Sequence, residues 1–221
     1  MTGTGNDIVA LKAINVVRTK QSNFYSKILS AAEKTLYDEQ FANTLAFENF
    51  VWLLWSVKES AYKYLQRFTP ELVFSPTRVS IQTLAPPAQH SLKIFEGATI
   101  EDNGFDDQAG YKGVVKCGST QLYSRSIINH DFIFSVVNGE DDFTHTCWGI
   151  RLIDSSETEY QSKAVRKFLI DKLDGLFPDM AFTIEKSPEG IPALFNGTEV
   201  TNIPVSLAHH DRYIAYSFQL K

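Results

Sequence analysis

The sequence predicts an α+β protein of two lobes, each a small antiparallel sheet packed on helices, and three observations lead to this fold class. Residues 44–66 are apolar around most of a helix. Strand-like segments separated by prolines follow this helix. Residues 126–133 resemble residues 206–213, which indicates an internally duplicated fold with a site where the lobes meet. Chance similarity between two short hairpins is the alternative explanation for this repeat.

The composition is that of an ordinary soluble protein, and it excludes several function classes. The 221 residues suffice for one large domain or two lobes, and the net charge of -5 argues against nucleic acid as a partner. Any anionic ligand therefore requires a local basic cluster. Cys117 and Cys147 lie far apart, outside any metal-type spacing. Because the chain has neither a signal-like N-terminus nor an apolar run long enough for a bilayer, we expect a cytoplasmic protein without a membrane partner.

The first lobe is expected to comprise residues 1–138. It opens with a strand at residues 7–11, and Ser30 to Glu33 looks like a helix start whose capping box is incomplete. The long helix at residues 44–66 follows. Further strands are expected at residues 78–83, 90–95, 111–116, 121–127 and 132–137.

The second lobe is expected to comprise residues 139–221, after a linker at residues 138–142. A strand at residues 147–153 precedes a helix with Ser156 as its N-cap and Glu159 closing the capping box, and Gly175 and Pro178 end this helix. The remaining strands are expected at residues 181–185, 203–207 and 213–220.

Two carboxylates and a lysine are spaced for phosphate chemistry. Asp7 lies in an apolar first strand, and Glu59 and Lys63 project from one face of the long helix because they are four residues apart. A Glu followed by a Lys at this spacing is also the commonest stabilising pair on a helix surface. The apolar circumference indicates a buried helix instead, and charges on a buried helix need partners. The pattern therefore favours a site where a divalent metal and a phosphate meet.

Three motifs resemble those of one family. They are the run Gly5 to Val9, the run Trp55 to Lys63, and Ser206 to His209 followed by Tyr213. Together they resemble the metal strand, the catalytic helix and the Ser-x-Ser-His element of the 4'-phosphopantetheinyl transferase superfamily. The chain is similar to surfactin-type, two-lobed members with the halves exchanged, since its motif order is that of the small holo-acyl-carrier-protein synthases. We therefore expect a monomeric pseudo-dimer.

The chain departs from the family pattern at three positions. Ala208 replaces the second Ser, and Ile191 replaces a basic residue in a turn that resembles the family's Gly-Lys-Pro element. Val9 stands where surfactin-type members often place a third acidic ligand, although Val is normal there in the small synthases.

The resemblance implies transfer of the 4'-phosphopantetheine group from coenzyme A to a serine of an apo acyl or peptidyl carrier protein, with release of 3',5'-ADP. Such carriers serve fatty acid, polyketide or peptide synthesis. Asp7 and Glu59 are the implied ligands of Mg²⁺, which prefers oxygen donors. Glu59 is the implied acceptor of the serine proton, directly or through water, and Lys63 stabilises the leaving phosphate.

The same resemblance implies a coenzyme A site built from both lobes. Lys63 comes from the first lobe, and Lys163, Arg166 and His209 come from the second. A solvated helix face is an equally good explanation for Lys163 and Arg166. For His209 the alternative is a histidine that is hydrogen-bonded in the core. Lys12, Arg18, Lys20 and Lys27 are candidates for docking an acidic carrier protein.

Two other hypotheses remain open at the level of sequence. A degenerate pair of lobes would bind coenzyme A or a carrier protein without transfer, as Ile191 and Ala208 suggest. An unrelated α+β protein would carry the motifs by accident. The second hypothesis requires that Asp7 and Glu59 do not converge.

Overall fold

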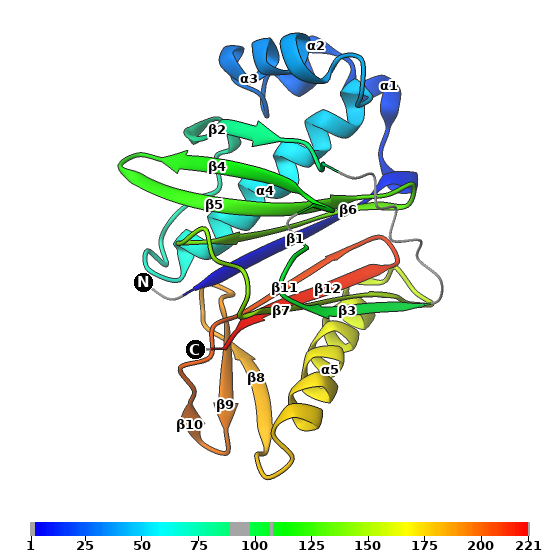
Figure 1. Ribbon diagram of the computed structural model, residues 1–221. Coiled ribbons are helices and arrows are strands. Elements are labelled where there is room, and N and C mark those ends of the chain that lie inside the picture. The colour runs from blue at the N-terminus through cyan, green and yellow to red at the C-terminus, as the bar shows by residue number, and fades with distance from the viewer. Residues whose placement is uncertain (1–2, 89–97, 107, 221) are drawn as a thin grey trace.

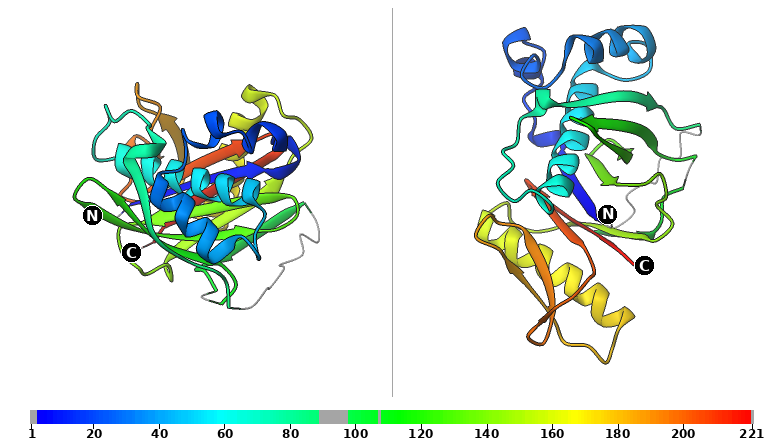
Figure 2. Two further views of the ribbon diagram at one scale, coloured as in Figure 1. Left: turned by 90° about the horizontal axis from the view of Figure 1, so that it is seen from above. Right: turned by 90° about the vertical axis from the view of Figure 1, so that its left-hand side faces the viewer.

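The computed structural model describes residues 3–88, 98–106 and 108–220, and it is an α+β arrangement of antiparallel sheets with few helices. Two sheets pack against each other, and one long helix covers the outer face of each (Figure 1). Figure 2 shows these helices, cyan and yellow, on opposite sides of the two sheets. The strand predicted at residues 90–95 lies outside the described residues.

The first sheet has the strand order β1-β6-β5-β4-β2, and all of its neighbours are antiparallel. Its strands are β1 (Thr4–Ala10), β2 (Val79–Ala85), β4 (Tyr111–Cys117), β5 (Thr120–Ile128) and β6 (Phe132–Asn138). The helices of this half are α1 (Val16–Thr19), α2 (Ser22–Tyr25), α3 (Ala31–Leu36) and α4 (Phe47–Gln66). The helix α4 packs across β1 and β6.

The second sheet has the strand order β11-β12-β7-β3, and a smaller sheet, β10-β9-β8, lies beside it. The strands are β3 (Thr99–Asn103), β7 (Thr146–Leu152), β8 (Phe182–Lys186), β9 (Pro192–Asn196), β10 (Glu199–Val200), β11 (Val205–His210) and β12 (Tyr213–Gln219). The helix α5 (Thr158–Leu176) packs on β11, β12 and β8. Although β3 belongs to the first half of the sequence, it pairs with β7 in the second sheet.

The order of elements repeats along the chain. The series β1, α4, β2, β4, β5, β6 is followed by β7, α5, β8, β9, β11, β12, with the short helices α1, α2 and α3 and the strands β3 and β10 as additions. In both halves the first strand pairs with the last, and the last forms a hairpin with the strand before it. The two hairpins contain the similar segments at residues 126–133 and 206–213.

Two helix starts differ from the sequence prediction. The capping box of α3 is complete: Ser30 Oγ accepts from the Glu33 amide, and the Glu33 carboxylate accepts from the Ser30 amide. The helix α5 begins one residue later than predicted, with Glu157 as its N-cap and no side-chain cap. There the Ser155 hydroxyl accepts a hydrogen bond from the Glu157 amide. Ser155, and not Ser156, therefore closes the turn before the helix.

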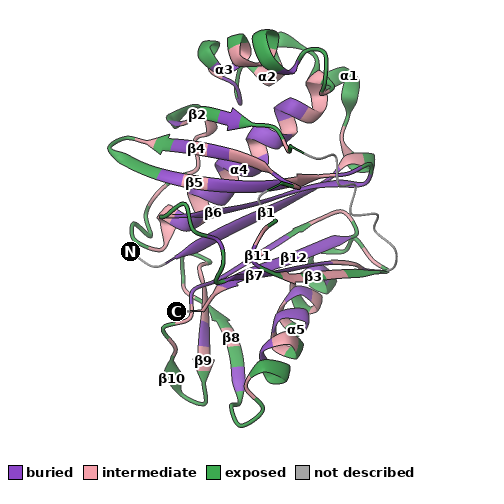
Figure 3. Ribbon diagram, in the orientation of Figure 1, coloured by how far each residue is buried: buried purple, intermediate pink, exposed green. Residues whose placement is uncertain are grey.

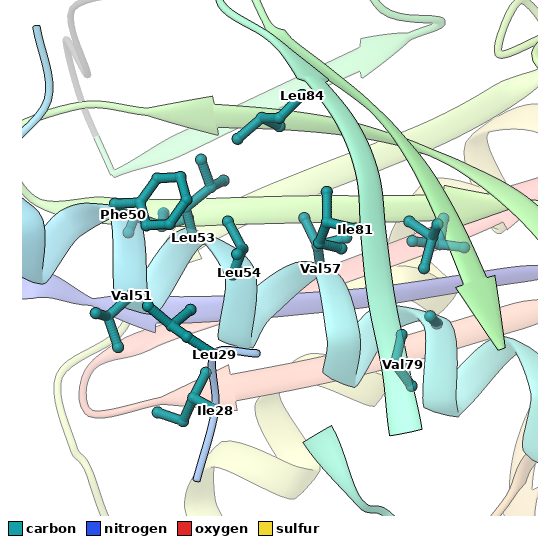
Figure 4. Packing of buried hydrophobic residues seen from close by; sticks show 14 of the residues in the cluster. Ile28, Leu29, Phe50, Val51, Leu53, Leu54, Val57, Val79, Ile81 and Leu84 are labelled. Atoms are coloured by element: carbon teal, nitrogen blue, oxygen red, sulfur yellow. The ribbon is translucent and has the colours of Figure 1, made fainter. Parts of the chain in front are cut away.

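Each sheet buries one apolar face under its helix and the other against the opposite sheet. Figure 4 shows the cluster between α4 and the first sheet, where Leu54 and Val57 of the helix approach Ile81 of β2. A second cluster lies under α5. A third joins the sheets through Ile8, Phe134 and Trp148. As Figure 3 shows, β1, β6 and β12 are therefore buried along nearly their whole length.

In the part of the chain that the structure describes, no helix combines the length and apolar character that crossing a membrane requires.

Candidate active site

Asp7, Glu59 and Lys63 meet between β1 and α4. Alternation along β1 turns Asp7 toward the helix, and the absence of a side chain at Gly5 lets α4 lie close to the strand. The Lys63 ammonium lies 3.3 Å from Asp7 Oδ1 and 3.3 Å from Glu59 Oε1, and it donates to the Asn6 carbonyl at 3.0 Å. Asp7 and Glu59 therefore converge on one ammonium group.

The electrostatics of this cluster disfavour a second negative charge. Burial, and then the charge of Glu59, raise the pKa of Asp7 to about 7, and Lys63 offsets these effects only in part. Burial also opposes the charge of Lys63, but Asp7 and Glu59 raise its pKa above the ordinary value. The Lys63 ammonium is thus kept protonated. The positive charge near the buried Asp7 carboxyl is too small to offset the effects that raise its pKa.

The donor set fits a divalent cation of the magnesium type. Asp7 Oδ2 is buried and has no hydrogen-bond partner among the described residues. Mg²⁺ is commonly bound by one or two carboxylates, with phosphate and water oxygens as the other ligands. Within the described ranges no group of three or more His, Cys, Asp or Glu side chains could hold a metal. A divalent cation bound here would therefore have only the carboxylates of Asp7 and Glu59 as charged ligands among the described residues, and it would need further oxygen atoms from a ligand or water.

The strand β11 lies along the free edge of β1 and brings residues of the second sheet to this cluster. Ser206 Oγ accepts from the Asn6 amide at 3.0 Å, and His210 Nδ1 accepts from the Ala10 amide at 2.8 Å. The four-residue spacing of these side chains matches that of the two amides. Ser206 and His210 thus satisfy amides of an edge strand that has no neighbouring strand on this side in the described part of the sheet.

His209 projects from the other face of β11, because side chains alternate along a strand. It lines a pocket of about 270 Å³ together with Glu59, Lys63, Arg67, Lys186 and the turn at residues 190–192. Burial, followed by the charges of Lys63 and Lys186, lowers the pKa of His209. The pocket therefore joins the carboxylate and lysine cluster of α4 to a neutral imidazole from the second sheet.

The structure brings four of the six predicted site residues together: Asp7, Glu59, Lys63 and His209. Lys163 lies outside this pocket, since it pairs with Glu159 at 2.6 Å on an exposed face of α5 and lines a different hollow with Arg151. Arg166 does not line the pocket either, although Ser162, one turn earlier on α5, does. The Nε atom of Arg166 is buried without a hydrogen-bond partner in the described segments.

The three departures from the family pattern have different surroundings. Ile191 lines the pocket and contributes no charge. Ala208 also lines it, but the residue is 2% exposed and belongs to the apolar cluster between the sheets. Val9 is buried under α4. Alanine and valine at these two positions are therefore packing residues.

Sequence reasoning missed Arg67 and Lys186, which supply two further cations to the pocket. Arg67 follows Lys63 by four residues, so the i, i+4 rule that links Glu59 to Lys63 could have found it. Lys186 ends β8 and carries no comparable signal, because only the tertiary fold brings β8 to the end of α4.

Comparison with protein families agrees with this geometry. Residues 3–101 match the family model described as ACPS, the 4'-phosphopantetheinyl transferase superfamily. No curated protein and no solved structure matches the chain. The matched segment contains β1 and α4, and with them Asp7, Glu59 and Lys63. Residues 3–101, just under half of the chain, are thus similar to the 4'-phosphopantetheinyl transferase superfamily.

Proposed function

We propose that the protein transfers the 4'-phosphopantetheine group of coenzyme A to a serine hydroxyl of an apo acyl or peptidyl carrier protein. The observation that carries this proposal is the convergence of Asp7, Glu59 and Lys63 beside His209 in one pocket. The serine oxygen forms a bond to the phosphorus of the pantetheine arm, and the bond to the bridging oxygen of the pyrophosphate breaks. The products are the holo carrier protein and 3',5'-ADP.

In this proposal Asp7 and Glu59 would hold Mg²⁺ together with oxygen atoms of the ligand. The bound ion would neutralise charge on the pyrophosphate as its bond breaks. Glu59, which is more exposed than Asp7, accepts the proton of the serine hydroxyl directly or through water. Lys63 is kept protonated by the two carboxylates and stabilises the leaving phosphate.

The coenzyme lies in the pocket between α4 and β11 and reaches His209. Arg166 remains a candidate for its outer part because Ser162, on the same side of α5, lines the pocket. The proposal keeps the lobes at residues 1–138 and 139–221 as the halves of a pseudo-dimer, which the repeated order of elements supports. Monomeric behaviour follows if the two halves replace separate subunits.

An acidic carrier protein is proposed to dock on the segment after β1. Arg18 and Lys27 are exposed there, and Val17 beside them is 74% exposed. Lys20 pairs with Glu48 at 3.1 Å and Lys12 with Asp131 at 2.7 Å, so these two are partly neutralised. The exposed cations around an apolar side chain suit an acidic partner.

The test is the intact mass of an apo acyl carrier protein after incubation with the protein, coenzyme A and Mg²⁺. We expect a gain of one phosphopantetheine, which Glu59→Ala and a chelator abolish. Glu159→Ala is the matched control, because Glu159 and Lys163 form the same i, i+4 pair outside the pocket. Its activity is expected to equal that of the wild type.

A non-catalytic member of the same fold is the alternative, and the uncharged Ile191 in the pocket is the observation that favours it. Measurable binding of coenzyme A without a mass gain on several carriers would establish this alternative and refute the transferase.

A further inference from the structure

The guanidinium of Arg67 is a partly buried cation without an acidic partner among the described residues. Arg67 follows the last residue of α4. Its hydrogen bond within the described residues is a long one, 3.4 Å from Nη2 to the Pro192 carbonyl. In the same part of the structure no carboxylate lies within ion-pair distance of it. Burial lowers the pKa of Arg67 to about 10, with no neighbouring charge to raise it.

The two buried or partly buried lysines of α4, Lys58 and Lys63, have carboxylate partners. Lys58 is fully buried and lies 2.8 Å from Glu33, and Lys63 has both Asp7 and Glu59. Buried charges are paired in folded proteins because desolvation without a counter-charge is unfavourable. Arg67 breaks this pattern, so its counter-charge is expected to come from outside the chain.

The surroundings of Arg67 have room for such an anion. Arg67 lines the pocket that contains Lys63 and His209, and it also lines a neighbouring hollow of about 370 Å³. Ile191 and Pro192 line both spaces, so Arg67 stands at the wall between them. Glu189, the acidic residue of the adjacent turn, is engaged by Ser187 Oγ at 2.7 Å. Glu189 also lines the larger hollow, but no ion pair joins it to Arg67 among the described residues.

The positive charge of the pocket points to a phosphorylated ligand. Lys63, Arg67 and Lys186 line it, and Glu59 is its one acidic residue among those described. Lys63 is already shared by two carboxylates, whereas Arg67 offers a planar set of donors suited to two oxygens of one phosphate. Ile191 on the same wall adds no charge.

We infer that Arg67 binds a phosphate group of the ligand that occupies the pocket between α4 and β11. The assignment of that phosphate to coenzyme A rests on the proposed function. In the bound state the guanidinium would gain the counter-charge that no described residue provides. Arg67 is then a residue for ligand affinity, whose removal affects binding more than folding.

Calorimetric titration of the full chain with coenzyme A and, separately, with inorganic pyrophosphate tests this inference. Arg67→Gln is expected to weaken both affinities at least about tenfold, which corresponds to about 1.4 kcal/mol. Arg67→Lys keeps the positive charge, and its affinities for both ligands are expected to lie between those of the wild type and those of Arg67→Gln. Arg212→Gln is the matched control, because that guanidinium also donates to one carbonyl, of Ile153, but lies outside both hollows.

Thermal unfolding separates a binding role from a structural one. Without ligand, Arg67→Gln is expected to melt at the wild-type temperature or above it, because no ion pair is broken. With coenzyme A, its gain in melting temperature is expected to be smaller than that of the wild type. Unchanged affinities for both ligands, or a ligand-free melting temperature clearly below that of the wild type, would overturn the inference.

The two ligands keep this inference distinct from the proposed function. Binding of pyrophosphate that depends on Arg67, without binding of coenzyme A, supports the anion site and refutes the proposed coenzyme. A wild-type protein that binds neither ligand refutes the anion site itself.

Discussion

Asp7 is the residue at which folding and function oppose each other most directly. Its side chain is buried beside Glu59, and one of its carboxylate oxygens lacks a hydrogen-bond partner among the described residues. A structural role alone would be served better by a neutral side chain, because an under-compensated buried carboxylate destabilises the folded state. Strained electrostatics of this kind are typical of functional sites.

We expect Asp7→Asn to increase the free energy of unfolding at about pH 8 in chelator. The pKa of Asp7 is about 7 in the folded protein against an ordinary value of 3.8. The stability associated with the protonated carboxyl is therefore full below about pH 3.8 and is lost as the pH rises through about 7. Urea unfolding of both proteins from about pH 4 to about pH 8 measures this, and the advantage of Asn should grow with pH.

Two further measurements complete this prediction. Asp171→Asn removes a carboxylate paired with Lys167 at the surface of α5. Its unfolding free energy relative to the wild type is not expected to increase with pH. Mg²⁺ is expected to stabilise the wild type and not Asp7→Asn. A pH-independent difference between the wild type and Asp7→Asn would contradict the electrostatic account.

At the scale of elements, the contact between β1 and α4 sets the geometry of the site. A Cβ atom at Gly5 would lie 2.0 Å from the Ser60 carbonyl oxygen and 2.7 Å from the Tyr64 amide nitrogen. These are backbone atoms of α4, so the helix itself would have to move. Since Glu59 and Lys63 lie on this helix and Asp7 on this strand, such a movement would separate the three side chains.

Gly5→Ala is therefore expected to lower both stability and activity. Overpacking of this kind costs about 1–3 kcal/mol of unfolding free energy, and occasionally more. The matched control is Gly175→Ala in α5, where a Cβ meets nothing within 4 Å and where Ala is expected to stabilise the helix by about 0.5–1 kcal/mol. Chemical unfolding and the carrier mass assay measure the two effects. A Gly5→Ala protein with wild-type stability would show that α4 is not held against β1 as described.

At the scale of the whole molecule, the two halves share a core. Ile8 and Phe134 of the first sheet pack with Trp148 and Ala215 of the second, and all four are at most 2% exposed. The side chains of β11 also satisfy backbone groups of β1. Neither half can therefore bury its apolar surface alone, and the pocket exists because the halves are joined.

We expect residues 1–138, produced alone, to lack a uniquely packed structure. The face of β1 and β6 that covers the second sheet would be exposed to water, and a surface of that kind binds apolar dyes and promotes association. Amide dispersion in NMR and binding of an apolar fluorescent dye test this, with the full chain as the reference. A fragment with a dispersed spectrum and no dye binding would show that the first half folds independently.

The sequence by itself determined the local parts of this protein. Apolar periodicity predicted α4, and alternation predicted most strands, because both patterns follow from which face of an element meets the core. It also selected Glu59 and Lys63, since helical spacing fixes which side chains share a face, and it selected Asp7 as an acidic residue in an apolar strand. The polar edge strand β3 was missed because its sequence, Thr99–Asn103, has no apolar face to reveal it.

Only the tertiary structure decided how these parts meet. It distinguished His209 from His210: the imidazole of His210 accepts a hydrogen bond from the Ala10 amide, whereas His209 lines the pocket. It placed Lys163 on a different surface and added Arg67 and Lys186 to the site. It also gave Glu33 a second task as the counter-ion of Lys58. These contacts join residues far apart in the chain, and the packing of two sheets across a shared core, which no local pattern encodes, is what brings them together.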